Sequence, residues 1–181
     1  MRRVVGAVAV LGMLALSGCG GGDPLPTLPP TPSSTPVFAS EEEALAAAEA
    51  AYSAYLEMSN LISSEGGVDP ERIAPFVTAD QLSDELDGFA YFADNDIRSV
   101  GSSRVTRVLL QQYGEVQGDV EITFYACVDV SNVVIVDGGG NDVTPVDRDS
   151  LVALEVSMTG DSDPLLVSDS DQWSDSQFCF S

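Results

Sequence analysis

The spacing of apolar positions changes about halfway along the chain. Up to about residue 96 they recur every three or four residues, which is the period of an amphipathic helix. From about residue 104 they alternate with polar residues, as in β-strands with one buried face. Residues 41–181 have the size of a single domain, and we predict an α+β domain with helices first and an antiparallel sheet of four to five strands after.

The first predicted helix has clear signals at both ends. Ser40 and Glu43 form a capping box, Ser-x-x-Glu, and Gly66 and Gly67 end the helix. Its apolar stripe consists of Leu45, Ala48, Tyr52, Tyr55 and Ile62. This stripe is expected to pack against the sheet.

Two more helices are expected before the strands. An Asp-Pro pair at 69–70 predicts a short helix that reaches Phe76. Thr78 and Gln81 repeat the capping pattern and open a third helix, which residues 94–96 end. One face of this helix carries Leu82, Leu86, Phe89 and Ala93.

The clearest strand runs from Asp119 to Val130. One face carries Val120, Ile122, Phe124, Ala126, Val128 and Val130, and the other carries Glu121, Thr123, Tyr125, Cys127 and Asp129. Further strands are predicted at Arg104–Tyr113, at Val133–Val136, at Leu151–Met158, and from Leu165 to about Trp173.

In the order of its elements, residues 41–175 resemble the cone fold of nuclear-transport-factor-2-like domains, as found in actinobacterial surface lipoproteins. The resemblance implies a curved sheet wrapped around the first helix, with a cavity between them for a small ligand, catalysis or dimer contacts. No sequence motif aligns with that family, so no functional residue is transferred from it.

The first nineteen residues carry a targeting signal. Arg2 and Arg3 precede an apolar run from Val4 to Leu16, which is shorter than the roughly 20 residues of a membrane-spanning helix. The run ends in Leu16-Ser17-Gly18-Cys19. This stretch resembles the lipobox of bacterial prolipoproteins. The resemblance implies a signal peptide at 1–18, cleavage before Cys19, and a lipid on the Cys19 thiol that anchors the protein to the extracytoplasmic face of the cell membrane.

Residues 19–40 combine the lipid-bearing cysteine with a segment rich in proline, glycine, serine and threonine. Such a segment buries too little apolar surface to offset the entropy of ordering it. Its prolines keep it extended, at ~3.1 Å per residue. We expect a disordered tether between the membrane and the domain at 41–181.

The charge of the chain excludes some partners. The chain has 29 acidic residues, seven arginines, no lysine and a formal net charge of -22. This charge repels phosphate backbones, so we expect no nucleic-acid partner. Anionic membrane surfaces are also unfavourable, so attachment to the membrane depends on the lipid. Cationic, neutral or apolar partners remain.

Three cysteines are present, and the lipobox uses Cys19. In an exported protein, Cys127 and Cys179 are then expected to form a disulfide, which would hold the C-terminus against the strand that contains Cys127. Two free buried thiols and pairing between chains are the alternatives. The pair is interpreted as structural because no nearby group would activate a thiolate.

Composition removes most catalytic chemistries. Without histidine there is no Ser-His-Asp or Cys-His mechanism, and without lysine there is no Schiff base. The acidic clusters fit no calcium-loop spacing, so neither a metal site nor a cofactor is expected. Proton transfer by a carboxylate or a tyrosine remains open.

These exclusions favour a non-catalytic binding module for a small ligand or an envelope protein. The alternatives are a cavity enzyme that uses Asp or Tyr proton transfer and a structural envelope protein. The candidate ligand-binding residues are Tyr52, Tyr55, Tyr125, Asp129 and Trp173. The cavity-enzyme alternative would require the first four to meet in a cavity, whereas tyrosines at helical spacing are more often plain core residues.

Overall fold

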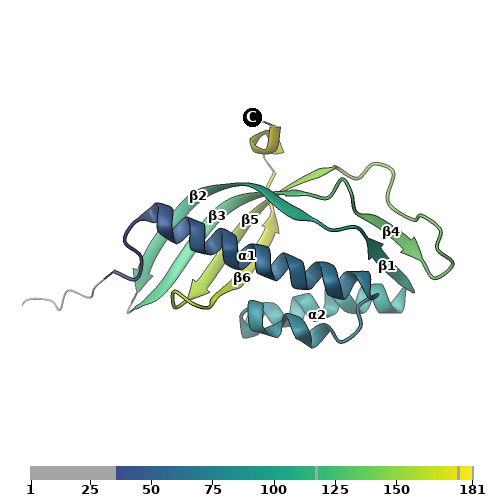
Figure 1. The fold of residues 1–181 in the computed structure, drawn as a ribbon, viewed down its shortest axis with the longest axis horizontal. Coiled ribbons are helices and arrows are strands. Elements are labelled where there is room, and N and C mark those ends of the chain that lie inside the picture. Colours follow the sequence, from purple (N-terminus) through teal and green to yellow (C-terminus); the bar gives the residue numbers. More distant parts are fainter. Residues whose placement is uncertain (1–35, 117, 175, 181) are drawn as a thin grey trace, which may run out of the picture. The chain divides into compact units, whose positions relative to one another are not determined.

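The computed structural model describes residues 36–181 except 117, 175 and 181. Helices pack on an antiparallel four-stranded sheet, beside which lies a small two-stranded sheet (Figure 1). The predicted α+β class is confirmed. The predicted signal peptide, Cys19 and most of the predicted tether lie outside the described residues, where the predictions about them stay untested.

The three helices predicted before the strands are present. They are α1 (Glu41–Ser64), the 3₁₀ helix η1 (Pro70–Phe76) and α2 (Ala79–Asp94). Helices α1 and α2 begin directly after their predicted capping residues. The Ser40 hydroxyl accepts a hydrogen bond from the Glu43 amide at 3.2 Å, and the Thr78 hydroxyl accepts one from the Gln81 amide at 3.3 Å. Each hydroxyl satisfies an amide that has no partner inside the helix.

The main sheet contains the four longest strands, in the order β2-β3-β5-β6, with all neighbours antiparallel. Its strands are β2 (Arg104–Val116), β3 (Asp119–Asp129), β5 (Leu151–Gly160) and β6 (Leu165–Gln172). β2 is an edge strand with register shifts near Thr106 and Gln111, and such bulges discourage pairing with other chains.

The core lies between the sheet and the helices. Val120, Ile122, Phe124, Ala126 and Val128 of β3 are all buried on the predicted face. They meet the α1 stripe, of which Ala48, Tyr52, Tyr55 and Ile62 are buried and Leu45 is partly buried. The α2 face is less complete than predicted: Phe89 is buried, Leu82 and Leu86 are partly buried, and Ala93 is exposed.

The turn that follows α1 passes close to the backbone of α2. Gly66 and Gly67 both have positive φ, of 72° and 80°. A Cβ atom on Gly67 would lie 2.2 Å from the Phe89 carbonyl oxygen. Glycine at 67 therefore lets the chain leave α1 while it stays in contact with α2.

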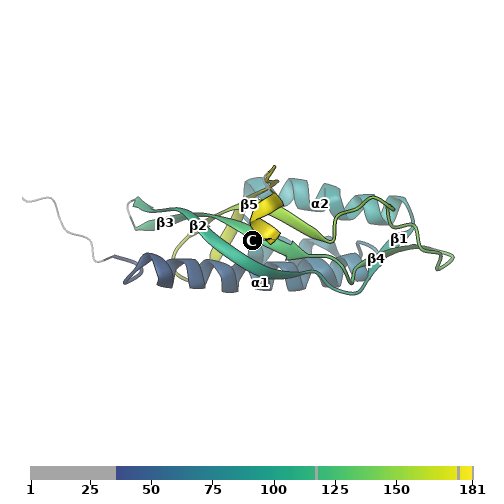
Figure 2. The ribbon, with the colours of Figure 1, turned by 90° about the horizontal axis from the view of Figure 1, so that it is seen from above.

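The structure adds two elements that the sequence analysis did not predict. Strand β1 (Ile97–Val100) pairs with β4 (Val134–Asp137), so β4 forms a separate ribbon and does not join the main sheet. The 3₁₀ helix η2 (Ser176–Phe180) follows the main sheet at the C-terminus. Seen from above, η2 lies over the middle of the sheet and the β1–β4 ribbon lies near one end of α1 (Figure 2). In the described part of the chain, no helix has both the length and the apolarity needed to span a membrane.

Candidate functional site

Tyr52 and Tyr55 lie in the core between α1 and the sheet. Their rings stack with centroids 5.5 Å apart, and Tyr52 meets the Phe124 ring of β3 edge-on at 5.8 Å. Tyr52 is 1% exposed and Tyr55 8%. These side chains occupy the middle of the space between α1 and the sheet, where the cone resemblance implied a cavity.

The phenol of Tyr55 links α1 to α2. It donates a hydrogen bond to Oε1 of Glu85 at 2.7 Å, and Nε2 of Gln81 lies 3.4 Å from the same oxygen. Burial and the Glu85 carboxylate raise the pKa of Tyr55 well above its usual range. Burial raises the pKa of Tyr52 to about 12, although a hydrogen bond with Ser170 opposes the shift. Both phenols stay protonated at neutral pH, and neither is poised to transfer a proton.

Tyr125 and Trp173 lie on the outer face of the sheet, the face turned away from α1. Their rings stack with centroids 3.7 Å apart, and Phe178 of η2 meets both rings edge-on. Partial burial raises the pKa of Tyr125, and the Glu155 carboxylate on the adjacent strand adds to this. The two rings form a small apolar cluster beneath η2.

Asp129 ends β3 on the same outer face. Its Oδ2 pairs with Nη2 of Arg104 at 2.7 Å, and its Oδ1 accepts a hydrogen bond from the Ser131 amide at 2.9 Å. The hydrogen bonds from Ser131 and the charge of Arg104 hold the pKa of Asp129 below its usual range. The carboxylate therefore stabilises the junction after β3 and is not a proton donor.

Tyr52, Tyr55, Tyr125 and Asp129 do not meet in one cavity, as the cavity-enzyme alternative requires, and the two helix tyrosines are core residues. The first two project from α1 into the core, whereas the last two lie on the face of β3 that is turned away from α1. Alternation along β3 explains the separation: Phe124 points towards Tyr52, so its neighbour Tyr125 points away.

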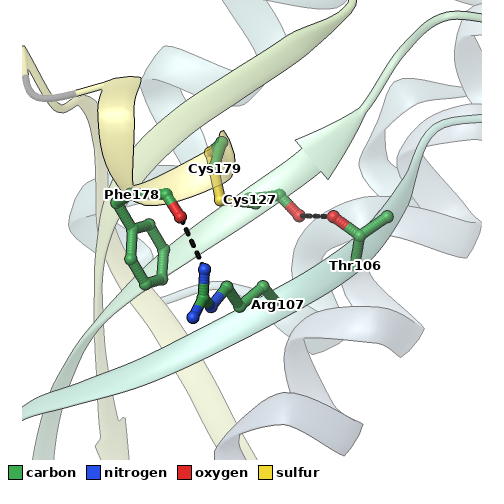
Figure 3. Close-up of a disulfide and its surroundings, with 5 residues drawn as sticks. All are labelled: Thr106, Arg107, Cys127, Phe178 and Cys179. Atoms are coloured by element: carbon green, nitrogen blue, oxygen red, sulfur yellow. Dashed lines mark hydrogen bonds between the residues drawn. A yellow bond between two sulfur atoms is a disulfide. The ribbon is translucent and has the colours of Figure 1, made fainter. Parts of the chain in front are cut away.

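The predicted bond between Cys127 and Cys179 is confirmed (Figure 3), with 5.5 Å between the two Cα atoms. It fastens η2 to β3. Nη1 of Arg107 on β2 donates to the Phe178 carbonyl oxygen at 2.9 Å, and its guanidinium lies 5.1 Å from the centre of the Phe178 ring. Thr106 Oγ1 lies 3.2 Å from the Cys127 carbonyl oxygen. The disulfide is thus surrounded by contacts that hold η2 against the sheet, as expected for a structural bond.

A pocket of about 560 Å³ opens between the second half of α1 and the start of β2. At its centre Asn60 Oδ1 accepts hydrogen bonds from the amide and the hydroxyl of Ser103, and Asn60 Nδ2 donates to the Ser103 carbonyl at 2.9 Å. Three hydrogen bonds of the Asn60 side chain therefore join α1 to the segment before β2.

A second feature lies between the end of α2 and the β1–β4 ribbon, and we call it the tip groove. It has a volume of about 460 Å³. Its lining is Tyr91, Phe92, Asn95, Ile97, Ile135, Asp137, Val143 and Pro145. Tyr91 is 61% exposed, Val143 is 46% exposed, and the nearby Val146 is fully exposed. Apolar side chains in contact with water across one groove are typical of an interaction surface.

An adjoining pocket of about 650 Å³ lies on the other side of Phe92, Ile97 and Asp137, which line both hollows. Its remaining lining is Glu65, Gly66, Val68, Ala93, Asp96, Arg98 and Gly138–Gly140. Val68 is 56% exposed. The tip groove is thus mainly apolar, whereas the adjoining pocket combines apolar side chains with three acidic ones and one arginine.

Sequence reasoning missed the tip groove. Tyr91 and Phe92 lie in the predicted third helix but off its predicted apolar face. Two aromatic residues outside the face that enters the core were the signal in the sequence for a second apolar surface. Val143, Pro145 and Val146 stand in a segment between strands, where apolar residues have no core to enter. Within the described residues, no three acidic or cysteine side chains converge in a way that would hold a metal ion.

Comparisons with known proteins give no family. No family model and no curated protein matches the chain. The fold is similar to the intermembrane space region of the chloroplast protein ARC6, with 9% identity and a TM-score of 0.49 over 69% of this chain and 92% of that one. It is also similar to CagV, a VirB8 homolog of the T4SS from Helicobacter pylori strain 26695, with 14% identity and a TM-score of 0.40 over 71% and 98% of the two chains. At these identities the likeness concerns the arrangement of helices and strands alone.

Proposed function

We propose that this protein is a lipoprotein on the extracytoplasmic face of the cell membrane, anchored through Cys19, and that its domain binds another envelope protein without catalysing a reaction. The observation that carries the proposal is the position of the tip groove: an exposed apolar surface at the end of the domain opposite to the point where the chain enters.

The point of entry is fixed by several contacts. The Val37 amide donates to Oε1 of Glu115 at 2.9 Å, and Tyr113 donates its phenol to the same oxygen. Phe38 is buried, with its ring edge-on to that of Tyr113 at 6.3 Å. The chain is thus attached firmly to the end of β2 just before α1 begins.

The groove and the entry point lie at opposite ends of α1. The β1–β4 ribbon lies beside the C-terminal end of that helix, whereas residue 36 precedes its N-terminus (Figure 1). A helix of this length spans about 36 Å, at ~1.5 Å per residue. The groove therefore lies well away from the point where the chain enters the domain, so the entering segment does not cover it.

The location rests on two independent features. Lipobox residues 16–19 indicate export with lipid attachment at Cys19. The Cys127–Cys179 disulfide is of the kind that persists in oxidising compartments outside the cytoplasm. Neither feature depends on the other.

The cavity enzyme is less favoured because its residues do not converge. Tyr52 and Tyr55 are packed in the core with raised pKa values, and Asp129 is paired with Arg104 on the other face of the sheet. A small ligand is also less favoured than a protein, because Tyr52 and Tyr55 occupy the middle of the space between α1 and the sheet and the pocket beside the start of β2 is open. A purely structural role does not account for apolar side chains left in water at the tip.

Photo-cross-linking in cells tests the docking role. The full chain would carry p-benzoylphenylalanine at Val146 in one strain and at Leu109, which is 51% exposed on the outer face of β2, in another. We expect one discrete cross-linked species from position 146 that position 109 does not give. Equal labelling at both positions, or no adduct at 146, would contradict the proposal.

Mass spectrometry of the protein extracted from cells tests the anchor separately. We expect an N-terminus at Cys19 that carries a diacylglyceryl group, and a Cys19→Ser variant that keeps its signal peptide. An unmodified Cys19 in the wild type would remove the lipid anchor from the proposal without affecting the docking role.

A further inference from the structure

The floor of the tip groove is apolar and comes from three separate segments. Tyr91 and Phe92 end α2, Ile97 begins β1, and Ile135 belongs to β4. Val143 closes the groove from the segment after β4, and its amide donates to the Ile135 carbonyl at 2.9 Å. The floor is therefore held by regular structure and needs no rearrangement before it can accept an apolar side chain.

The rim is acidic. Asp137 lines both hollows, and Asp96 lines the adjoining pocket. Asp142 lies beside them, since it forms a bridge with Val136 of β4. Arg98 is the cation in the lining of these two hollows, so carboxylates outnumber cations around the floor.

Two of the rim carboxylates, those of Asp137 and Asp142, are held in place and ionised. Asp137 Oδ1 accepts hydrogen bonds from the amides of Gly139 and Asn141 at 2.9 and 2.8 Å, and its Oδ2 accepts one from the Asn141 side chain at 2.9 Å. Asp142 Oδ1 accepts a bond from the Thr144 amide at 2.9 Å. Hydrogen bonds from Asn141 and from Thr144 hold the pKa values of Asp137 and Asp142 below their usual range. Asp137 and Asp142 therefore keep their negative charge at neutral pH and present it in a fixed geometry.

A second copy of the chain does not suit this surface. The chain carries a formal net charge of -22, so two copies would bring acidic rims together. A compact small molecule fits poorly as well, because Phe92, Ile97 and Asp137 divide the surface into two open hollows. An extended chain can place alternate side chains in two neighbouring hollows.

Building on the docking role proposed above, we propose that the tip groove binds an extended segment of a partner protein in which apolar side chains alternate with lysine or arginine. The apolar side chains enter the two hollows, and the basic ones meet the carboxylates at the rim. Apolar contact supplies most of the affinity, while charge complementarity selects basic segments over acidic ones.

The test titrates the full chain, purified in a non-ionic detergent, against a short fluorescein-labelled peptide of alternating Lys and Leu. Two matched peptides alternate Glu with Leu and Lys with Ser. Fluorescence anisotropy should show the tightest binding for the Lys–Leu peptide, and that binding should weaken as salt is raised from ~0.05 M to ~0.5 M. The proposal is overturned if the Lys–Leu peptide binds no more tightly than both of the others.

Matched variants locate the binding. Val143→Asp places a charge on the groove wall, and Leu109→Asp makes the same kind of change at a similarly exposed position on β2. We expect Val143→Asp to weaken binding by about tenfold or more and Leu109→Asp to leave it within about twofold. Equal effects from the two variants would place binding elsewhere and overturn the inference.

The role of the rim charge is tested by Asp96→Asn, with Asp84→Asn, an exposed acid earlier in α2, as its control. Asp96→Asn should weaken binding of the Lys–Leu peptide by about threefold and reduce its salt dependence, and the control should change neither.

Sedimentation tests whether a second copy of the chain occupies the groove. The free chain should sediment as a monomer, and a dimer that Val143→Asp dissociates would show that the occupant is a second copy. The two proposals can fail separately. If position 146 gives a discrete adduct in cells but the protein shows no preference for basic peptides, the docking role is supported and only the present inference is overturned.

Discussion

Tyr125 and Trp173 stack face to face on the outer side of the sheet, with ring centroids 3.7 Å apart and planes inclined by 7°. One residue belongs to β3 and the other directly follows β6, so the stack bridges the intervening strand β5. Phe178 covers both rings, and its neighbour Cys179 is bonded to Cys127. Because Trp173 is the single tryptophan of the chain, its fluorescence reports directly on this cluster.

Replacing both Cys127 and Cys179 with serine should lower the free energy of unfolding by about 2–4 kcal/mol, because the bond closes a sequence separation of 52 residues in the unfolded chain. It should also loosen η2 and shift Trp173 emission to longer wavelength before global unfolding. Urea unfolding followed by fluorescence measures both effects. Cys19→Ser is the control and should unfold as the wild type does. Coincident urea midpoints for the double variant and the wild type would contradict the stabilising role.

Gly67→Ala should destabilise the domain by more than about 2 kcal/mol. The added methyl would meet the Phe89 carbonyl oxygen at 2.2 Å, and the backbone has a φ of 80° that alanine adopts at a cost. Thermal unfolding measures the change. The matched variant is Gly88→Ala in the interior of α2, where no atom lies within 4 Å of the new methyl. That change should stabilise the domain by about 0.5–1 kcal/mol, through helix propensity alone. Effects of the same sign at the two positions would argue against the described contact between Gly67 and Phe89.

Stability should fall between about pH 10 and pH 12, and Tyr52 should contribute to the fall. Burial raises its pKa from 10.0 to about 12 in the folded protein. In this interval the unfolded chain gives up the phenolic proton while the folded protein keeps it, so rising pH favours unfolding, by up to about 1.4 kcal/mol per pH unit. Tyr52→Phe should flatten the alkaline slope of the unfolding free energy. Tyr91→Phe, at a position that is 61% exposed, serves as the control and should leave the slope as it is. An unchanged alkaline slope of the unfolding free energy in Tyr52→Phe would contradict a raised pKa of Tyr52 in the folded protein.

Ser99→Ala should raise the free energy of unfolding by about 0.5–1 kcal/mol. Ser99 is 4% exposed, and its hydroxyl has no hydrogen-bond partner within the described residues, so the folded protein carries a desolvation cost that alanine avoids. Ser102→Ala, at an exposed position after β1, should have little effect. Chemical denaturation compares the two, and a clear loss of stability in Ser99→Ala would mean that the hydroxyl contributes to the fold.

Local signals in the sequence predicted most of the fold. Ser40 and Thr78 mark helix starts because their hydroxyls accept hydrogen bonds from backbone amides of the first turn. The alternation of apolar and polar residues in β3 was visible because one face of the strand is buried and the other is not. Strand β1 gave no such signal, because it is only four residues long and its burial depends on contacts with α1 and α2. Over so few residues, the hydrophobic pattern of a strand cannot be told from that of a loop. The pairing of β4 with β1 is a long-range choice and has no local signature.

The candidate site was harder to predict than the fold. The predicted faces of β3 already placed Tyr125 and Asp129 opposite Phe124. Because α1 packs on the Phe124 face, these two residues could not lie beside Tyr52 and Tyr55 of α1. The tip groove depends on Tyr91, Ile135 and Val143 meeting from three segments. Their proximity follows from the position of the β1–β4 ribbon, which the sequence pattern did not predict.

The attachment of Val37 and Phe38 to the end of β2 has a mechanical consequence. A pull on the chain before residue 36 reaches Phe38, Glu115 and the first turn of α1 at once. If the opposite end of the domain is held by a partner, the force runs along the axis of α1 and loads the contacts between that helix and the sheet in shear. Many contacts then share the load, and the domain can transmit tension between its two ends without peeling apart strand by strand.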